Sequence, residues 1–185
     1  MAGLSVPLDP LATAAAVGLL VLVFARALLH KAADFAAFRQ SVEDYRVVPA
    51  SVAGPAALAL GAAELAVTLG LLLPATRVPA ALGAIGLLAL YAGAMAANLL
   101  RGRTAIDCGC GGPGQPIGWI LVGRNAVLAA AAALVLLPVA PRSLGILDMI
   151  AVPVMVLATW LVILAVEQLA RSFAHIRHMR ESGIE

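Results

Sequence analysis

The sequence has few charged residues, few aromatic residues and almost no cysteine. Of 185 residues, 12% are charged and 4% are aromatic, whereas 63% are hydrophobic. Soluble domains carry about 25% charged residues, so this scarcity excludes a soluble domain. The mean hydropathy of +1.02 agrees with that exclusion. The composition predicts an integral membrane protein whose surroundings are the lipid bilayer, and we expect no nucleic acid as a partner.

The first apolar run lacks the layout of a cleaved signal peptide. No basic residue precedes it, and the polar segment "ARALLHKAADF" follows it in place of a small-residue cleavage site. We therefore expect this run to be retained as the first membrane span.

Five apolar stretches are long enough for a helix to cross the bilayer, which takes about 20 residues. Alanine and leucine, both strong helix formers, dominate them. Pro153 inside the last stretch predicts a kink there. The fold class expected is all-α, a polytopic membrane helical bundle forming one integral membrane domain over residues 1–185 with a basic tail at 171–185. The predicted spans are 10–29, 51–73, 78–100, 117–137 and 144–170.

The segment between the first two spans, "KAADFAAFRQSVEDYRVVP", has two interpretations. Phe35 and Phe38 lie one helical turn apart among polar residues, a pattern typical of a short helix at the membrane surface. Alternatively, the first span simply extends into water.

The distribution of Lys and Arg predicts the orientation in the plasma membrane. With five spans, one side holds eight cations outside the spans and the other holds two, Arg77 and Arg142. Cytoplasmic loops carry the excess of positive residues, so we predict the N-terminus outside and the C-terminus in the cytoplasm. The eight cations are Lys31, Arg39, Arg46, Arg101, Arg103, Arg171, Arg177 and Arg180.

The two cysteines, Cys108 and Cys110, flank a single glycine in "IDCGCGG". Residues two apart lie about 5.5–7 Å apart at Cα, and disulfides need about 4.4–6.8 Å. Gly109 allows backbone angles that other residues avoid. A ring this small adds little stability, and strained, exposed disulfides are labile. The pattern favours thiol–disulfide exchange.

Two other interpretations of the cysteines stay open. The thiolates, with His30 as a third ligand, suit zinc or Cu(I). Alternatively, they are two small apolar residues in a glycine-rich turn. Upstream, Arg101 would favour a thiolate, whereas the adjacent Asp107 would oppose it or accept a proton.

Polar residues inside the spans form a second group of candidate site residues. Glu64 in the second span and Arg124 in the fourth are costly in lipid, so we expect them to form an ion pair. That pair is either functional or only locks the helices together. Other polar residues are expected to converge under the 101–116 loop, although Arg26, His30 and Lys31 also suit headgroup anchors. The converging residues are Arg26, His30, Asp34, Tyr91, Asn98 and Asn125.

Four segments resemble the methylamine utilisation protein MauE family, within the wider MauE/DoxX group. They are "ALLHKAADFAAFRQSVEDYRVVP", "AAELAVTLGLLLP", "NLLRGRTAIDCGCGG" and "GRNAVL", and the resemblance covers roughly residues 15–135. It implies a DoxX-like four-helix core with one additional span. Gly111 and Gly112 follow the cysteines where family members often have an aromatic residue.

The resemblance implies a role in maturing the disulfide-rich small subunit of methylamine dehydrogenase, beside a periplasmic thioredoxin-like protein, MauD. Cys108 and Cys110 would then be the exchanging pair of a thiol–disulfide oxidoreductase. The resemblance identifies no particular cofactor, and a membrane quinone stays open as a redox partner. The alternatives are a non-enzymatic assembly or chaperone subunit, and a metal-binding or transport protein using the thiols with Glu64 and Arg124.

The implied periplasmic role conflicts with the predicted cytoplasmic position of the cysteines. Three explanations remain. The arginines are retained for function and mislead the charge rule, or the pair relays electrons across the membrane, or it exchanges with a cytoplasmic reductant or a quinone.

Overall fold

The computed structural model describes residues 7–109 and 115–181, and the described residues are helical without any named strand. This confirms the predicted all-α fold. The helices are α1 (Pro10–Ala33), α2 (Phe35–Asp44), α3 (Ala50–Leu72), the 3-10 turn η1 (Pro74–Thr76), α4 (Arg77–Leu100), α5 (Trp119–Leu134) and α6 (Ile146–Glu181).

Four helical segments have the length and hydropathy of membrane spans, so the protein is a polytopic helical membrane protein. They are Pro10–Ala33, Ala50–Leu72, Pro74–Leu100 and Ile146–Leu169. The fourth predicted stretch, 117–137, contains the shorter apolar helix α5, whose 16 residues span about 24 Å. Helix α5 is shorter than predicted because the flanking backbone bonds elsewhere. Ile117 N donates to Ile106 O at 2.9 Å, and Pro138 O accepts from Leu8 N at 2.7 Å.

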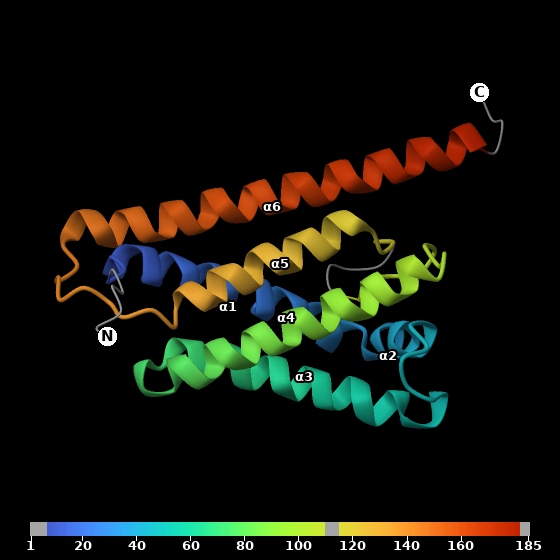
Figure 1. Ribbon diagram of the computed structural model, residues 1–185, viewed down its shortest axis with the longest axis horizontal. Helices are drawn as coiled ribbons and strands as arrows, with labels where there is room; N and C mark the ends of the chain where they lie inside the picture. Colours follow the sequence, from blue (N-terminus) through green and yellow to red (C-terminus); the bar gives the residue numbers. More distant parts are fainter. Residues whose placement is uncertain (1–6, 110–114, 182–185) are drawn as a thin grey trace, which may run out of the picture.

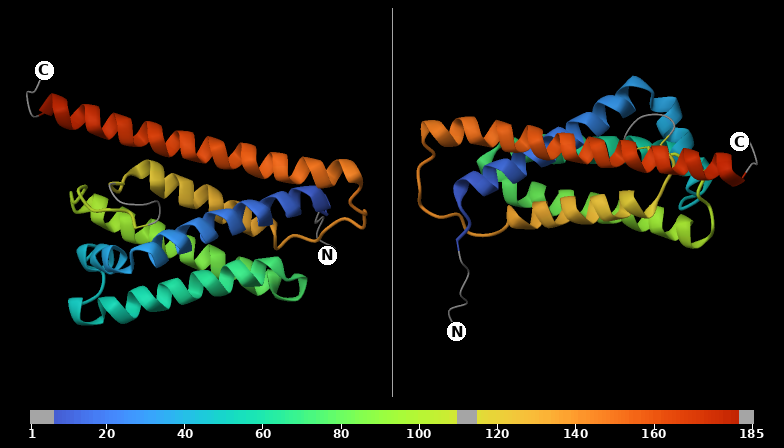
Figure 2. Two further views of the ribbon diagram at one scale, coloured as in Figure 1. Left: turned by 180° about the vertical axis from the view of Figure 1, so that it is seen from behind. Right: turned by 90° about the horizontal axis from the view of Figure 1, so that it is seen from above.

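The helices α1, α3, α4 and α5 surround a common core, and α6 packs outside it against α1 and α5 (Figures 1 and 2). A four-helix core with one additional helix was the predicted arrangement. Small residues let the backbones approach closely, which is how helices associate in lipid. A Cβ at Gly83 would lie 2.9 Å from Val67 Cγ2, and one at Gly18 would lie 2.8 Å from Val156 Cγ2.

The segment after α1 forms a separate helix, which decides between the two interpretations of the sequence. Asp34 leaves helical geometry with φ −142° and ψ 78°. Its carboxylate then accepts from Ala37 N at 2.9 Å, which caps the start of α2. Phe38 is buried where α2 packs on α3. The chain therefore turns back over the bundle at this point and does not extend away from it.

Long helices alternate in direction along the chain, so α2, the connection from α4 to α5 and the last turns of α6 lie at one end of the bundle (Figures 1 and 2). At the other end, Arg142 bonds Asp9 at 2.9 Å and Asp148 at 2.7 Å. Helix α6 continues through Pro153 and includes the predicted basic tail up to Glu181; residues 182–185 lie outside the described part.

Candidate functional site

Cys108 lies on the connection between α4 and α5, and its side chain is only 5% exposed. Its Sγ lies 4.0 Å from Met95 Sδ of α4. Ile106, Ile117 and Leu121 complete the apolar cluster around it. The second predicted thiol, Cys110, falls with residues 111–114 outside the described part of the chain.

The connection is closed at its base by backbone hydrogen bonds. Cys108 N donates to Gln115 O at 2.8 Å, and Ile117 N donates to Ile106 O at 2.9 Å. Gly109 has φ +71°, in the left-handed region that favours glycine. Gly109 therefore adopts backbone angles that other residues avoid, as its place between the two cysteines indicated.

Polar side chains from α2 and α4 hold this connection in place. Tyr45 OH donates to the carbonyl oxygen of Cys108 at 3.3 Å, and Asn98 Nδ2 donates to Tyr45 O at 3.0 Å. Arg103 donates to Asn98 Oδ1 and to Asp44 O, both at 2.7 Å. Asn98 is thus placed under the cysteine loop, as predicted, and it fixes the end of α2 against the end of α4.

Glu64 pairs with Lys31 of α1 and not with Arg124, so the predicted Glu64–Arg124 pair is wrong. Lys31 Nζ donates to Glu64 Oε1, and Tyr91 OH donates to the same oxygen at 2.6 Å. Lys31 is 4% exposed and Glu64 is fully buried. The ammonium also lies 4.6 Å from the ring centre of Phe38. Lys31 is therefore no headgroup anchor but part of a buried polar centre.

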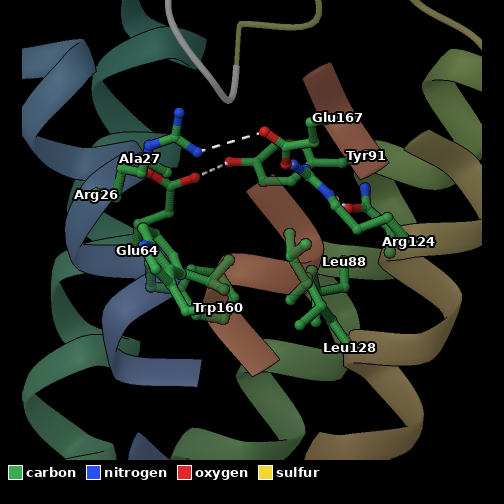
Figure 3. A pocket seen from close by; sticks show the side chains of 13 residues that line it. Arg26, Ala27, Glu64, Leu88, Tyr91, Arg124, Leu128, Trp160 and Glu167 are labelled. Carbon is green, nitrogen blue, oxygen red and sulfur yellow. Dashed lines mark hydrogen bonds and ion pairs between the residues drawn. The ribbon is translucent and has the colours of Figure 1, made fainter. Parts of the chain in front are cut away.

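Arg124 of α5 instead pairs with Glu167 of α6, because its side of α5 faces α6. Arg26 of α1 approaches the other oxygen of Glu167 at 3.5 Å (Figure 3). Asn125 Oδ1 accepts from Arg124 at 3.2 Å, and Asn125 is buried. Three helices are thus joined through one carboxylate.

A small cavity of about 30 Å³ separates the Lys31–Glu64 pair from the Arg124–Glu167 pair. Figure 3 shows Glu64 and Arg124 on opposite sides of it, with Tyr91 beside Glu167 and reaching across to bond Glu64. Glu64 Oε2 is buried without a hydrogen-bond partner. A buried carboxylate oxygen without a partner is costly, and this one borders the small cavity.

A larger cavity of about 360 Å³ lies between α2, α3, α4 and the cysteine loop. Its lining is mainly apolar. Cys108 borders it together with the polar groups of Lys31 and Tyr91 and the rings of Phe38 and Tyr45. The predicted cysteine site and the buried Lys31–Glu64 centre are therefore parts of one region.

Several predicted site residues are not among the side chains that pack around Cys108. His30 is exposed near the end of α1, Arg101 caps the end of α4 in solvent, and Asp107 is exposed on the loop. Asn125 belongs to the Arg124–Glu167 group. Within the described residues, no three His, Cys, Asp or Glu side chains are grouped to hold a metal ion.

Two residues of the buried ion pairs were not predicted as site residues from the sequence, Glu167 and Lys31. Glu167 is a carboxylate inside the fifth apolar stretch, so the signal that identified Glu64 applies to it equally. Lys31 carried a weaker signal, because a lysine near the end of a span usually reaches the headgroups.

A membrane helical bundle with two buried ion pairs and a thiol on a fastened loop defines an integral membrane protein with an intramembrane polar site. The sequence profile described as "Methylamine utilisation protein MauE" matches residues 8–138. Because this match covers more than half of the chain, the protein belongs to the MauE family.

Individual relatives support the assignment. The methylamine utilization protein MauE of Paracoccus denitrificans is 45% identical over 115 residues, which cover 61% of this chain and 62% of the relative, less than two thirds of its length. The MauE protein of Methylorubrum extorquens is 44% identical over 139 residues, 73% of this chain and 75% of the relative. The MauE protein of Paracoccus versutus is 45% identical over 136 residues, which cover 71% of this chain and 73% of the relative. No solved structure matches the chain.

Proposed function

We propose that this protein takes part in methylamine utilisation by exchanging thiols and disulfides through Cys108 and Cys110 with a thioredoxin-like partner. The exchange would serve the maturation of a disulfide-containing protein. The observation that carries this proposal is the fastening of the cysteine loop by Tyr45, Asn98 and Arg103. Family membership supports the process.

The burial of Cys108 supports a division of roles between the two sulfurs. In the oxidising direction, a thiolate of the partner attacks the disulfide at Cys110, and Cys108 leaves as a thiolate. The second partner thiolate then attacks the mixed disulfide, which releases the partner's disulfide and leaves both cysteines reduced. Two electrons pass from the partner to the protein, and the partner's two thiol protons end on Cys108 and Cys110.

We keep the plasma membrane with the N-terminus outside as the proposed location. Lys31 is buried and no longer counts toward the charge bias, which leaves seven cations against two. Labelling of the thiols with a membrane-impermeant reagent tests the orientation. If the loop is cytoplasmic, labelling requires permeabilised cells, and labelling in intact cells would reverse the proposed orientation.

A double substitution tests the exchange itself. Cys108→Ser with Cys110→Ser should abolish maturation of the disulfide-containing partner, and a reducible disulfide should be detected by mass shift only in the unsubstituted protein. Thr104, exposed on the same loop, supplies the control variant Thr104→Ser. Full maturation by the double variant would exclude thiol exchange.

A second candidate function is supported by the apolar surroundings of Cys108, which suit a side chain that only packs. In that case the protein is a non-enzymatic assembly subunit. Cys108→Ala keeps a small apolar group but removes the sulfur. Maturation supported by Cys108→Ala favours the assembly subunit, whereas its loss with normal folding favours exchange.

A further inference from the structure

We propose that the 360 Å³ cavity beside Cys108 binds the ring of a membrane-borne quinone, which accepts the electrons of the cysteine pair. This inference rests on the proposed exchange function and names the oxidant class for the same site.

The cavity is reached from the lipid side of the bundle. Ala59 of α3 and Leu90 of α4 border it, and both are exposed on membrane-spanning helices. At 1.5 Å per residue, each lies about 14–15 Å from the nearer end of its helix. That depth is about half of the hydrocarbon core. A ligand that enters here is therefore dissolved in the bilayer.

The walls suit a flat apolar ring. The rings of Phe38, Tyr45 and Tyr91 border the cavity, and alanines such as Ala56 and Ala94 leave the space open. Pockets for small organic ligands have volumes of about 300–1,000 Å³ and apolar or aromatic linings with few polar groups. The cavity is at the lower end of this range, which fits a ring with a short part of its tail.

The polar groups favour a neutral hydrogen-bond acceptor over an anionic headgroup. Lys31 has three N–H donors, of which Glu64 Oε1 and Tyr91 OH accept two. The third N–H lies beside the Phe38 ring at the cavity wall, where a ligand oxygen can replace the ring as its acceptor. Because Glu64 balances the charge of Lys31, the pair offers a hydrogen bond without an excess positive charge. The carbonyl oxygen of a quinone matches this arrangement.

The thiols of Cys108 and Cys110 supply the electrons that reduce the quinone. The S–H bonds of Cys108 and Cys110 break and their S–S bond forms. The two electrons and two protons released convert the quinone to a quinol, with two new O–H bonds. Lys31 donates a hydrogen bond to the oxygen that gains electron density. Cys108 is placed for this step because it borders the same cavity as Lys31 and Tyr91.

Titration of the purified full-length protein with decylubiquinone tests the inference. We expect saturable binding to the unsubstituted protein and reduction of the quinone when the protein has been pre-reduced. Ala94→Phe fills the cavity and should abolish binding. The matched control is Ala89→Phe on the exposed side of α4, which should bind normally. Thermal unfolding checks that both variants fold, and Ala56→Leu replaces Ala94→Phe if that variant does not.

The outcomes separate this inference from the proposed function. The variant Cys108→Ser with Cys110→Ser should bind the quinone without reducing it, while Ala94→Phe should still exchange with a reduced thioredoxin-like protein. Absence of saturable binding, or equal displacement of the quinone by phospholipid, overturns the quinone site and leaves thiol exchange standing. Loss of exchange with binding retained overturns the proposed function alone.

Discussion

Lys31 of α1 and Glu64 of α3 form an ion pair inside the bundle, and Tyr91 of α4 donates to the same carboxylate oxygen. Three of the helices that border the larger cavity are thus joined at one polar centre. In lipid, neither charge has water as an alternative partner. The pair therefore constrains how α1, α3 and α4 pack and holds the Lys31 ammonium at the wall of the cavity.

Removing one member of this pair should destabilise the protein strongly. Lys31→Met leaves a buried carboxylate alone and should lower the free energy of unfolding by about 3–5 kcal/mol. The double variant Lys31→Met, Glu64→Leu should recover most of this loss because no buried charge is left unpaired. Unfolding in detergent measures both values.

The matched control is the pair of Arg39, which is exposed, and Glu43, which is partly buried, on α2, with 3.0 Å between nitrogen and oxygen. Arg39→Met should cost about 0.3–0.5 kcal/mol, since water replaces the lost partner. Equal costs at the two sites would contradict the burial of Lys31.

Glu167 should decide whether α6 stays attached to the rest of the bundle. Few of the residues in the membrane-spanning part of α6 are buried, and its ion pairs to Arg26 of α1 and Arg124 of α5 both use this carboxylate. Loss of a buried pair, about 3 kcal/mol, corresponds to about 100-fold faster local opening. For Glu167→Gln we therefore expect faster amide hydrogen exchange in α6 and little change in α4. Gln168→Ala, at the exposed neighbouring position, is the control. Equal acceleration in both helices would show that Glu167 supports the whole bundle.

The sequence predicts the membrane helices well because each depends on its own residues. A long apolar run with small side chains is sufficient for a span. Phe35 and Phe38 indicated the helix α2 but left an extension of the first span open, and the cap formed by Asp34 decides between them. Glu64 was also identified from its position alone, since a carboxylate in a span is costly wherever its partner lies.

The pairing of the charges was not predictable in the same way. Whether Glu64 meets Arg124 or Lys31 depends on which helices are neighbours and at what depth, and neither follows from one helix. The position of the larger cavity could not be predicted from single helices either. Ala94 borders open space, whereas Gly83 packs closely against Val67, yet both read as small residues in one helix.

We expect the ion pair of Arg142 with Asp9, at the end of the bundle opposite the cysteines, to be lost in acid. The hydrogen bond of Arg142 to Asp9, with one from Leu11 N–H, lowers the pKa of that carboxyl below its ordinary value of 3.8. Folding thus favours the ionised carboxylate, so its contribution to stability is complete above pH 3.8 and disappears as the pH falls through the lowered pKa. Unfolding of the unsubstituted protein and of Arg142→Gln should differ at neutral pH and converge in acid. A difference that persists below that pKa would assign the effect to another contact; Arg101→Gln, at an exposed arginine, is the control.

Gly109 should be sensitive to substitution through its backbone alone. A Cβ there would lie 3.5 Å from Phe38, an ordinary contact, so crowding is not the obstacle. The left-handed φ of +71° costs other residues about 1–2 kcal/mol, and asparagine tolerates this region better than alanine. Labelling of the Cys108 thiol should therefore be fastest in Gly109→Ala, intermediate in Gly109→Asn and slowest in the unsubstituted protein, because the strained turn opens more often.

The control Gly123→Ala lies in α5 with open space around it and should leave the labelling rate unchanged. If Gly109→Ala and the unsubstituted protein label at the same rate, the turn does not hold Cys108 in its buried position, and the division of roles between the two sulfurs fails with it.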